Sequence, residues 1–418
     1  MRPKIVFMNK SATELILIRI TGEDRPGLTA SVTEILSKYD VTILDIGQAD
    51  IHNTLSLGIL FKTEERHSGK IMKELLFKAS SLGITIRFYP VSVEEYDDWV
   101  SMQGKNRYIL TLLGRKLSAT QISAVTRIVA DQGMNIDAIK RLTGRIPLDE
   151  RKANIRSCIE LSVRGNPINM SEMQAQLLKL SGELDMDYSL QLDNMYRRMR
   201  RLICFDMDST LIETEVIDEL AIKAGVGDQV KAITESAMRG EIDFTESFRQ
   251  RVALLKGLDE SVMKEIAENL PITEGVDRLM FVLKRYGYKI AILSGGFTYF
   301  GNYLKQKYGI DYVYANELEI VDGKLTGNYV GDVVDGKRKA ELLRLIAQVE
   351  SVDIAQTIAV GDGANDLPML GIAGLGIAYH AKPKVKQTAK QSINTIGLDG
   401  VLYFLGFKDS YLEEQGKL

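Results

Sequence analysis

The sequence is poor in cysteine and has no long hydrophobic run. Its 418 residues include only Cys158 and Cys204, each in an apolar stretch. Two cysteines cannot form a disulfide framework, so we expect buried free thiols in a reducing compartment. Residues 1–10 lack the apolar segment of a secretory signal, and no stretch is long enough to span a bilayer. We therefore expect a cytoplasmic protein without a membrane partner.

An excess of charge of either sign is also missing. The 53 Lys and Arg residues nearly balance the 56 Asp and Glu residues, and the formal net charge is -3. This balance gives no reason to expect nucleic acid as a partner. A basic cluster at residues 197–201 is interpreted as a solvated or interdomain helix face. The length exceeds what one hydrophobic core usually organises, which indicates two or three domains.

Residues 1–95 predict the order strand, helix, strand, strand, helix, strand. Apolar spacing indicates helices over 28–39 and 70–81. Two β-branched runs separated by His52 and Asn53 indicate a hairpin.

The same order recurs in residues 96–192, after an acidic linker around Glu94 to Asp98. We interpret the two copies as tandem ferredoxin-like βαββαβ domains, each with two helices on one face of an antiparallel sheet. The alternative is two unrelated α+β pieces.

Residues 193–418 have a different character. Short, wholly apolar runs at 202–205, 290–293 and 357–360 are separated by helical stretches. Continuous hydrophobicity indicates central parallel strands covered on both faces. The pattern predicts a doubly wound α/β domain, whose chemistry lies at the carboxyl ends of its strands.

Each of these runs leads directly into polar residues that could carry chemistry. Asp206 and Asp208 follow the first, Ser294 follows the second, and Asp362 and Asp366 follow the third. Carboxylates buried together are costly unless a cation balances them. Oxygen ligands favour magnesium, so we expect Mg²⁺ as cofactor. The alternative is helix N-capping, which explains any single residue but not three strand ends.

These residues suit phosphoryl transfer, which needs a nucleophile, charge neutralisation and a proton donor. We interpret Asp206 as the nucleophile and Asp208 as the general acid that then activates water. Ser294 and the Gly295 amide would hold the phosphate oxygens, and Lys339 would neutralise developing charge. Taken alone, a lysine in Asp335-Gly-Lys-Arg-Lys339 is more often a solvated surface charge, and only its position in the series of motifs favours a catalytic role.

Four segments resemble the motifs of the haloacid dehalogenase superfamily: Asp206-Met-Asp-Ser-Thr-Leu211, Leu293-Ser-Gly-Gly296, Lys339 and Gly361-Asp-Gly-Ala-Asn-Asp366. The resemblance covers essentially residue 201 to the end. It implies magnesium held by Asp206, Asp362 and the backbone carbonyl of Asp208, with Asp366 close by.

Residues 205–219 and 237–252 are similar to the phosphoserine phosphatase family. That resemblance implies a helical cap over about 214–272 and O-phosphoserine as substrate. The implied substrate residues are Glu215 for the ammonium, Arg251 for the carboxylate, Met238 and Phe244 closing the pocket, and Asn365. An Arg matches a planar carboxylate better than a Lys does. A salt bridge between cap helices is the competing interpretation of Glu215 or Arg251 alone.

The first two domains resemble ACT domains, modules that sense small molecules. Gly27, within Asp24-Arg-Pro-Gly-Leu28, would let the backbone approach an anionic group at a helix N-terminus. A plain turn and cap is nearly as good an interpretation. The second copy has Gly114-Arg-Lys-Leu-Ser118 there, so we regard it as degenerate. The resemblance implies a possible amino-acid effector and a homodimer.

The leading hypothesis is hydrolysis of O-phosphoserine to serine and phosphate through an aspartyl-phosphate, the last step of serine biosynthesis. A related phosphatase or phosphotransferase acting on another small phosphate ester is the first alternative. The second is an amino-acid sensor with an inactive catalytic half.

Overall fold

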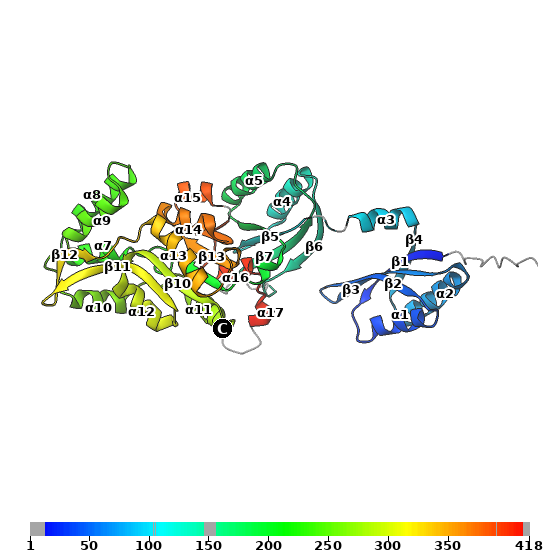
Figure 1. Cartoon of the computed structure of the whole chain (residues 1–418). Helices are drawn as coiled ribbons and strands as arrows, with labels where there is room; N and C mark the ends of the chain where they lie inside the picture. Colours follow the sequence, from blue (N-terminus) through cyan, green and yellow to red (C-terminus); the bar gives the residue numbers. More distant parts are fainter. Residues whose placement is uncertain (1–12, 103, 105, 146–155, 390, 413–418) are drawn as a thin grey trace, which may run out of the picture. The chain divides into compact units, whose positions relative to one another are not determined.

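The computed structural model describes residues 13–102, 104, 106–145, 156–389 and 391–412 (Figure 1). The chain forms two compact units, Met1–Gly104 and Lys105–Leu418. Among the helices of the described segments, none combines the length and apolar character that a membrane crossing requires. Both cysteines are free and buried, as predicted.

The first unit contains the predicted strand and helix order. Its sheet has the order β2-β3-β1-β4, and all its pairs are antiparallel. Alternate residues of β1, such as Ile18 and Ile20, are buried against both helices, which therefore cover one face. His52 has a φ of 59° in the two-residue turn between β2 and β3. The elements of this module are β1 (Thr13–Glu23), α1 (Leu28–Ser37), β2 (Thr42–Ile51), β3 (Thr54–Glu64), α2 (Glu65–Leu82) and β4 (Thr85–Val91).

The expected acidic linker is instead a helix, α3 (Val93–Ser101). The Ser92 side chain accepts a hydrogen bond from the Glu95 amide, and the Glu95 side chain accepts one from the Ser92 amide. This reciprocal capping box satisfies amides at the start of the helix, and the prediction missed it.

The second module repeats the order of the first. Its strands lie in the order β8-β5-β7-β6, again with antiparallel pairing. Ser118 and Gln121 form a capping box at the start of α4. The predicted polar loop before residue 157 lies in part outside the described residues. The elements are β5 (Arg107–Gly114), α4 (Ala119–Asp131), β6 (Asn135–Arg141), β7 (Ser157–Arg164), α5 (Met170–Glu183) and β8 (Asp187–Leu192).

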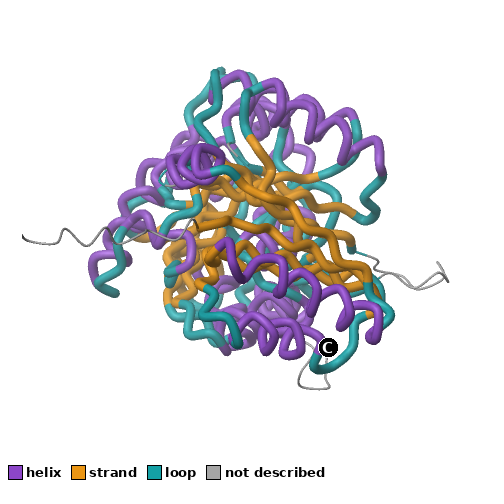
Figure 2. Tube along the Cα trace, turned by 90° about the vertical axis from the view of Figure 1, so that its right-hand side faces the viewer, coloured by secondary structure: helices purple, strands orange, loops and turns teal. Residues whose placement is uncertain are grey.

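The rest of the chain builds the predicted doubly wound α/β domain. Strands β10, β9, β13, β14 and β15 are parallel neighbours in that order. Successive residues of β9 enter different cores: Ile203 packs on one face of the sheet and Cys204 on the other. Helices cover both faces (Figures 1 and 2). The strands are β9 (Leu202–Phe205), β10 (Lys289–Phe297), β11 (Tyr312–Val321), β12 (Lys324–Val330), β13 (Thr357–Gly361), β14 (Leu375–Tyr379) and β15 (Ser392–Ile393).

A helical insertion separates strand β9 from α11, the next helix that packs on the sheet. Ile212 and Ile272 pair in an isolated antiparallel bridge, so the chain leaves the core and returns to it at the same place. The helices between them are α7 (Val216–Lys223), α8 (Gly227–Met238), α9 (Phe244–Ala253) and α10 (Ser261–Glu268). The remaining helices are α6 (Met195–Arg198), α11 (Val276–Arg285), α12 (Thr298–Tyr308), α13 (Gly336–Val349), η1 (Ile354–Gln356), η2 (Ala364–Asp366), α14 (Leu367–Ile372), α15 (Pro383–Thr388), α16 (Gly400–Phe404) and α17 (Asp409–Leu412).

The second module and the α/β domain share one sheet of 11 strands. The junction is the antiparallel pair of β15 with β8, at Ser392 and Tyr188. The sequence reasoning treated the two as separate domains and did not anticipate this junction. The boundaries proposed after residues 95 and 192, and the cap limits at 214 and 272, stay predictions.

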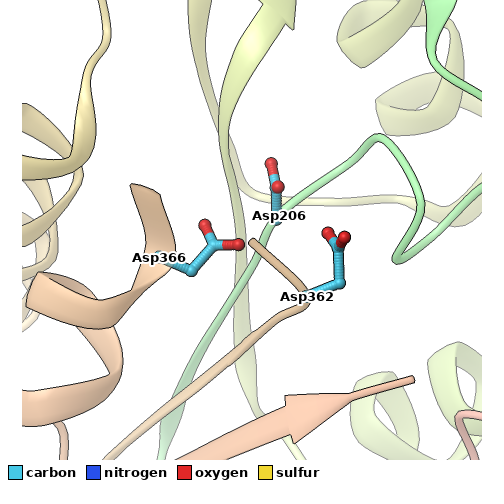
Figure 3. Close-up of side chains that lie close together, drawn as sticks. All are labelled: Asp206, Asp362 and Asp366. Atoms are coloured by element: carbon cyan, nitrogen blue, oxygen red, sulfur yellow. The ribbon is translucent and has the colours of Figure 1, made fainter. Parts of the chain in front are cut away.

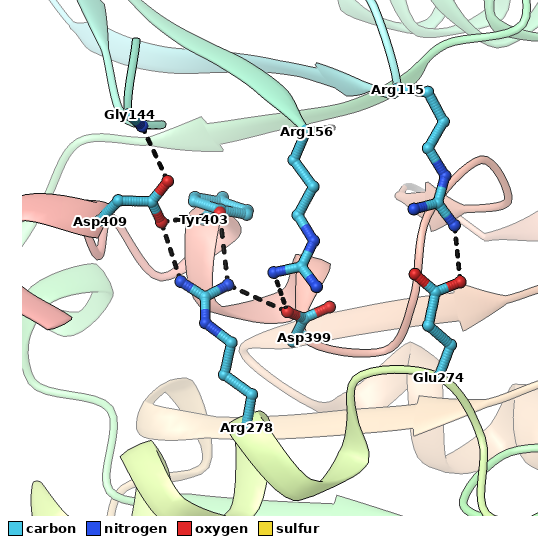
Figure 4. A network of polar contacts seen from close by, with 8 residues as sticks. All are labelled: Arg115, Gly144, Arg156, Glu274, Arg278, Asp399, Tyr403 and Asp409. Atoms are coloured by element: carbon cyan, nitrogen blue, oxygen red, sulfur yellow. Dashed lines mark hydrogen bonds and ion pairs between the residues drawn. The ribbon is translucent and has the colours of Figure 1, made fainter. Parts of the chain in front are cut away.

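Ion pairs reinforce the junction, and those of Asp399 are buried (Figure 4). Asp399 is fully buried and pairs with Arg156, next to β7, and with Arg278 of α11, at 2.9 Å. Arg115, just after β5, pairs with Glu274 at 2.6 Å. These contacts hold the second module and the α/β domain as one body.

The basic cluster at residues 197–201 is only partly what was predicted. Arg197 is buried and pairs at 2.9 Å with Glu160 of β7, which fits an interdomain position. Arg200 is also buried, and burial lowers its pKa to about 10. The solvated interpretation is therefore wrong for these two arginines.

Candidate active site

Three neighbouring parallel strands carry the candidate residues to one edge of the sheet. Asp206 follows β9, Asp362 follows β13, and Ser294 lies near the end of β10. Since β9 lies between β10 and β13, the carboxyl ends of all three strands meet. The order of the strands in the sheet thus explains why these side chains lie close together.

Asp206, Asp362 and Asp366 form a cluster that could hold a metal ion (Figure 3). One carboxylate oxygen from each lies within 4.8 Å of the others, and all three residues are buried. A Cβ at Gly361 would overlap the Asp366 side chain, so glycine is required for this approach. An all-carboxylate donor set of this kind suits a hard divalent cation.

The charges in this cluster are only partly balanced. Lys339 is fully buried and contacts Asp206 at 2.8 Å and Asp366 at 2.7 Å. Burial, together with the nearby Asp366 carboxylate, still raises the pKa of Asp206 well above its ordinary value. The same two causes raise the pKa of Asp362 to about 7. A bound cation would stabilise all three carboxylates in their ionised form.

Asp208 lies beside the cluster, and its carboxylate is not part of it. Its Oδ1 accepts a hydrogen bond from the Val216 amide at 3.2 Å. A Cβ at Gly296 would overlap the other carboxylate oxygen. Burial and the Glu215 carboxylate raise the pKa of Asp208 well above its ordinary value. A raised pKa favours the protonated form of this carboxyl group, which is the form that can donate a proton to a leaving group.

The segment after the apolar part of β10 is held by its own hydrogen bonds. The Ser294 hydroxyl is fully buried and accepts from the Gly296 amide at 2.9 Å. Asn316 of β11 donates to the Gly295 carbonyl at 2.7 Å and accepts from the Val334 amide at 2.8 Å. Asn316 was missed by the sequence reasoning, because its strand also contains Glu317 and Glu319 and gave no signal that this one polar residue is buried.

Two cap residues lie near the Asp208 carboxylate. Glu215 accepts a hydrogen bond from the Ser209 hydroxyl at 3.0 Å, and Ser209 has a φ of 57°. Burial lowers the pKa of Arg251, while the charges of Glu215, Asp218 and Asp208 oppose that shift. Arg251 therefore lies among three carboxylates. Asp218, which the sequence reasoning did not select, is part of this group, and burial raises its pKa.

The other expected substrate residues differ in their positions. The Phe244 ring lies over the strand end, with Cζ 3.1 Å from where a Cβ of Gly295 would be. Asn365 packs against Gly363 and Gly336, where a Cβ at either position would overlap it. Met238, at the end of α8, is 67% exposed. The structure thus brings Phe244 and Asn365 to this edge, whereas Met238 faces solvent.

Comparisons with known proteins identify the families that this chain resembles. Two ACT domain families match residues 14–89 and 107–191, and the haloacid dehalogenase-like hydrolase family matches residues 203–371. The chain is 37% identical to the phosphoserine phosphatase of Streptomyces coelicolor, over 95% of this chain and 93% of that protein. It is 39% identical to that of Mycobacterium tuberculosis, over 95% and 94%.

A solved structure is also similar. The probable phosphoserine phosphatase from Vibrio cholerae, in an unliganded form, is 36% identical with a TM-score of 0.56. The match covers 73% of this chain and 87% of that one.

Proposed function

Because the chain belongs to the phosphoserine phosphatase family of haloacid dehalogenase-like hydrolases, we propose that it hydrolyses O-phosphoserine to serine and phosphate with Mg²⁺ as cofactor. The observation that supports this most directly is the buried cluster of Asp206, Asp362 and Asp366 beside Lys339. Such a site has the charge to accept a phosphate dianion once a cation is present.

Asp206, Asp362 and the backbone carbonyl of Asp208 would hold the magnesium ion, with Asp366 nearby. When bound, Mg²⁺ would offset the charge of the carboxylates and of the phosphate oxygens. Three carboxylates against one lysine fit a divalent cation, because the cluster otherwise has an excess of negative charge.

Two carboxyl groups carry the proposed reaction. An Asp206 oxygen attacks phosphorus, and the bond from phosphorus to the serine oxygen breaks as the aspartyl-phosphate forms. Asp208 gives its proton to that serine oxygen. Asp208 then removes a proton from a water molecule, whose oxygen attacks phosphorus and restores the Asp206 carboxylate. Ser294, the Gly295 amide and Lys339 stabilise the phosphoryl oxygens throughout.

Cap residues provide the selectivity for an amino acid phosphate. Glu215 binds the ammonium group and Arg251 the carboxylate, each partly removed from water. Phe244 covers the pocket, Asn365 helps to hold the substrate, and Met238 closes the pocket when the cap moves in. The ACT domains bind an amino-acid effector, and the protein acts as a homodimer in the cytoplasm.

Replacing the nucleophile tests the mechanism. We expect Asp206→Asn to lower kcat on O-phosphoserine by roughly four orders of magnitude or more and to abolish an acid-stable phosphoprotein formed from labelled substrate. Removal of Mg²⁺ with a chelator should stop the parent enzyme, and its readdition should restore turnover. Unchanged turnover in Asp206→Asn would contradict the proposed function.

The substrate assignment has a matched control on the same helix. Arg251→Ala should raise KM for O-phosphoserine strongly, because the substrate carboxylate loses its partner. Arg249→Ala removes an exposed arginine that pairs with Glu246, and we expect wild-type kinetics. If Arg251→Ala kept its phosphoserine kinetics while other phosphomonoesters were cleaved well, the substrate would be another phosphate ester.

A further inference from the structure

Asn316 of β11 is a buried polar residue beside the proposed phosphate site, and it takes part in none of the proposed chemical steps. The residue is 2% exposed. A buried asparagine is unfavourable unless its donors and acceptors are hydrogen-bonded. Its hydrogen-bond partners therefore indicate what this residue holds in place.

The pairing of strands β10 and β11 is interrupted next to Asn316. The strands pair in parallel at Leu293 and Tyr314, and again at Phe297 and Asn316. Three residues of β10 lie between these pairs, but only one residue of β11 does. The segment 294–296 therefore bulges out of the regular ladder, and its backbone groups need other partners.

The Asn316 side chain provides partners for this segment. Its Nδ2 donates to the Gly295 carbonyl at 2.7 Å and to the Gly296 carbonyl at 3.3 Å. Its Oδ1 accepts from the Val334 amide at 2.8 Å. Because a carbonyl can only accept and a backbone N–H can only donate, these bonds fix which way the side-chain amide is turned. Asn316 thus holds the bulged segment in one position relative to Val334.

The peptide group between Gly295 and Gly296 transmits this restraint to Ser294. In a trans peptide the C=O and N–H groups point in opposite directions. Asn316 holds the carbonyl, and on the other side the Gly296 N–H donates to Ser294 Oγ at 2.9 Å. Within the described segments this is the one hydrogen bond of the Ser294 hydroxyl, and the oxygen accepts it. The hydroxyl hydrogen is therefore available for a donor bond.

The Ser294 hydroxyl lies beside the carboxyl group of the proposed general acid. A Cβ at Gly296 would overlap Asp208 Oδ2 and would lie 3.2 Å from Ser294 Oγ. We propose that Asn316 is a positioning residue: through the Gly295–Gly296 peptide it directs the Ser294 hydroxyl hydrogen at a phosphoryl oxygen. This inference rests on the proposed function, because it requires a phosphoryl group at Ser294.

The hydrogen bonds form a chain in which each donor points toward the active site. The Val334 N–H donates to Asn316, Asn316 donates to the Gly295 carbonyl, and the Gly296 N–H donates to Ser294. Aligned hydrogen bonds polarise one another, and a buried chain is little screened by water. The chain therefore makes the Ser294 hydroxyl a stronger donor to the charge that develops on the phosphoryl oxygens.

A double-mutant cycle in the full chain tests this role against a merely structural one. The readout is the binding of inorganic phosphate in the presence of Mg²⁺, measured by calorimetry, which needs no turnover. Asn316→Ala should weaken phosphate binding by about tenfold in the parent protein and by less than about twofold in Ser294→Ala, because the hydroxyl that it directs is then missing. The same non-additivity is expected in kcat on p-nitrophenyl phosphate.

A matched asparagine serves as the control. Asn328→Ala removes an exposed asparagine of the neighbouring strand β12, which donates to Glu319, and should bind phosphate as the parent does. A loss in Asn316→Ala that persists in full in Ser294→Ala would show that Asn316 only supports the fold. That result overturns the inference.

Asn316→Asp takes the place of Asn316→Ala in the cycle if the latter does not fold. It keeps the shape of the side chain and the acceptor for the Val334 amide, but its ionised form cannot donate to the Gly295 carbonyl. Burial favours the protonated form, which can donate, so phosphate binding relative to the parent should recover as the pH falls from about 8 to about 5. An unchanged ratio over this range would also overturn the inference.

The parent protein separates this inference from the proposed function. If the parent neither binds phosphate nor cleaves a phosphate ester, the proposed function fails and the role of Asn316 fails with it. If the parent does both but the effects of the Asn316 and Ser294 substitutions are additive, only the role of Asn316 is overturned.

Discussion

The two ACT domains have the same order of elements but different surroundings. In the first, β4 is an edge strand that, within the described part of the chain, pairs only with β1, and it contains Pro90. In the second, the corresponding strand β8 lies inside an 11-stranded sheet between β5 and β15. Proline cannot donate to a neighbouring strand, so β4 is suited to remain an edge. The difference teaches that one βαββαβ sequence pattern can give either a self-contained module or an integral part of a catalytic body.

The buried ion pairs give the largest expected effect, because they occur at the junction of the second ACT domain. Asp399→Ala leaves Arg156 and Arg278 without their shared partner in a dry site. We expect a loss of about 3–5 kcal/mol in the free energy of unfolding, measured by urea denaturation. In the first ACT domain, Glu23→Ala removes only an exposed pair with Arg25 and should cause no measurable change. Equal losses of stability in Asp399→Ala and Glu23→Ala would contradict the proposed difference between the two ACT domains.

A pair of matched core substitutions tests whether each ACT domain unfolds independently of the catalytic domain. Ile18 and Leu110 are fully buried in the first strand of their respective domains. Truncation of either to Ala should cost about 2–5 kcal/mol. Ile18→Ala should shift an unfolding transition that leaves phosphatase activity intact. Leu110→Ala should shift the transition at which activity is lost, as followed by calorimetry and residual activity.

A rise in pH should change the stability of the two units in opposite directions. Burial and Asp366 raise the pKa of Asp362 from 3.8 to about 7, so the metal-free folded state binds this proton more tightly than the unfolded state does. Its contribution is therefore present below pH 4 and lost as the pH rises to about 7. The pKa of Glu74 is lowered by its hydrogen bonds with Tyr39 and Lys38, so its contribution grows as the pH rises through 4.5.

Melting temperatures of the metal-free protein between pH 4 and pH 8 check this prediction. The transition of the second unit should fall with rising pH, and that of the first unit should not. Added Mg²⁺ should stabilise the second unit more at pH 8 than at pH 5, because protons compete with the cation at Asp362. A pH-independent effect of Mg²⁺ would contradict this account.

The smallest effect concerns the loops that follow the first strand of each ACT domain. Gly27 has a φ of 87°, a conformation that disfavours any side chain. Gly27→Ala should cost about 1 kcal/mol. Gly114 has no positive φ, and an added Cβ would make only ordinary contacts at 3.6 Å or more. Gly114→Ala should therefore be nearly neutral in thermal unfolding, and a similar cost for both would contradict the comparison.

Much of the fold and the candidate site could be predicted because the signals were local. Apolar runs such as 202–205 specify central strands, and the polar residues that follow them must meet at one sheet edge. The junction could not be predicted in this way, because β15 has only two residues and its partner β8 looks like an ordinary ferredoxin-like strand. Its pairing depends on where the whole chain places Ser392.

Other features were missed because they depend on tertiary contacts. Asn316 and Asp218 have no sequence motif, and their importance follows from the backbone carbonyls and charges around them. The burial of Arg197 requires Glu160, which lies 37 residues earlier in the chain. Helix α3 was missed despite a local signal, the Ser92 and Glu95 capping box.

The bridge between Ile212 and Ile272 has a consequence for how this enzyme class can diversify. Because the two ends of the insertion are neighbours, its length can change without moving the ends of the core elements that it joins, although α9 packs on the sheet, with Phe248 against Phe297 and Tyr329. If the insertion selects the organic part of the substrate as proposed, this region can be exchanged largely as a unit while the carboxylate cluster on the sheet stays in place. A new leaving group would require new helices between these two isoleucines and no change in the carboxylates below.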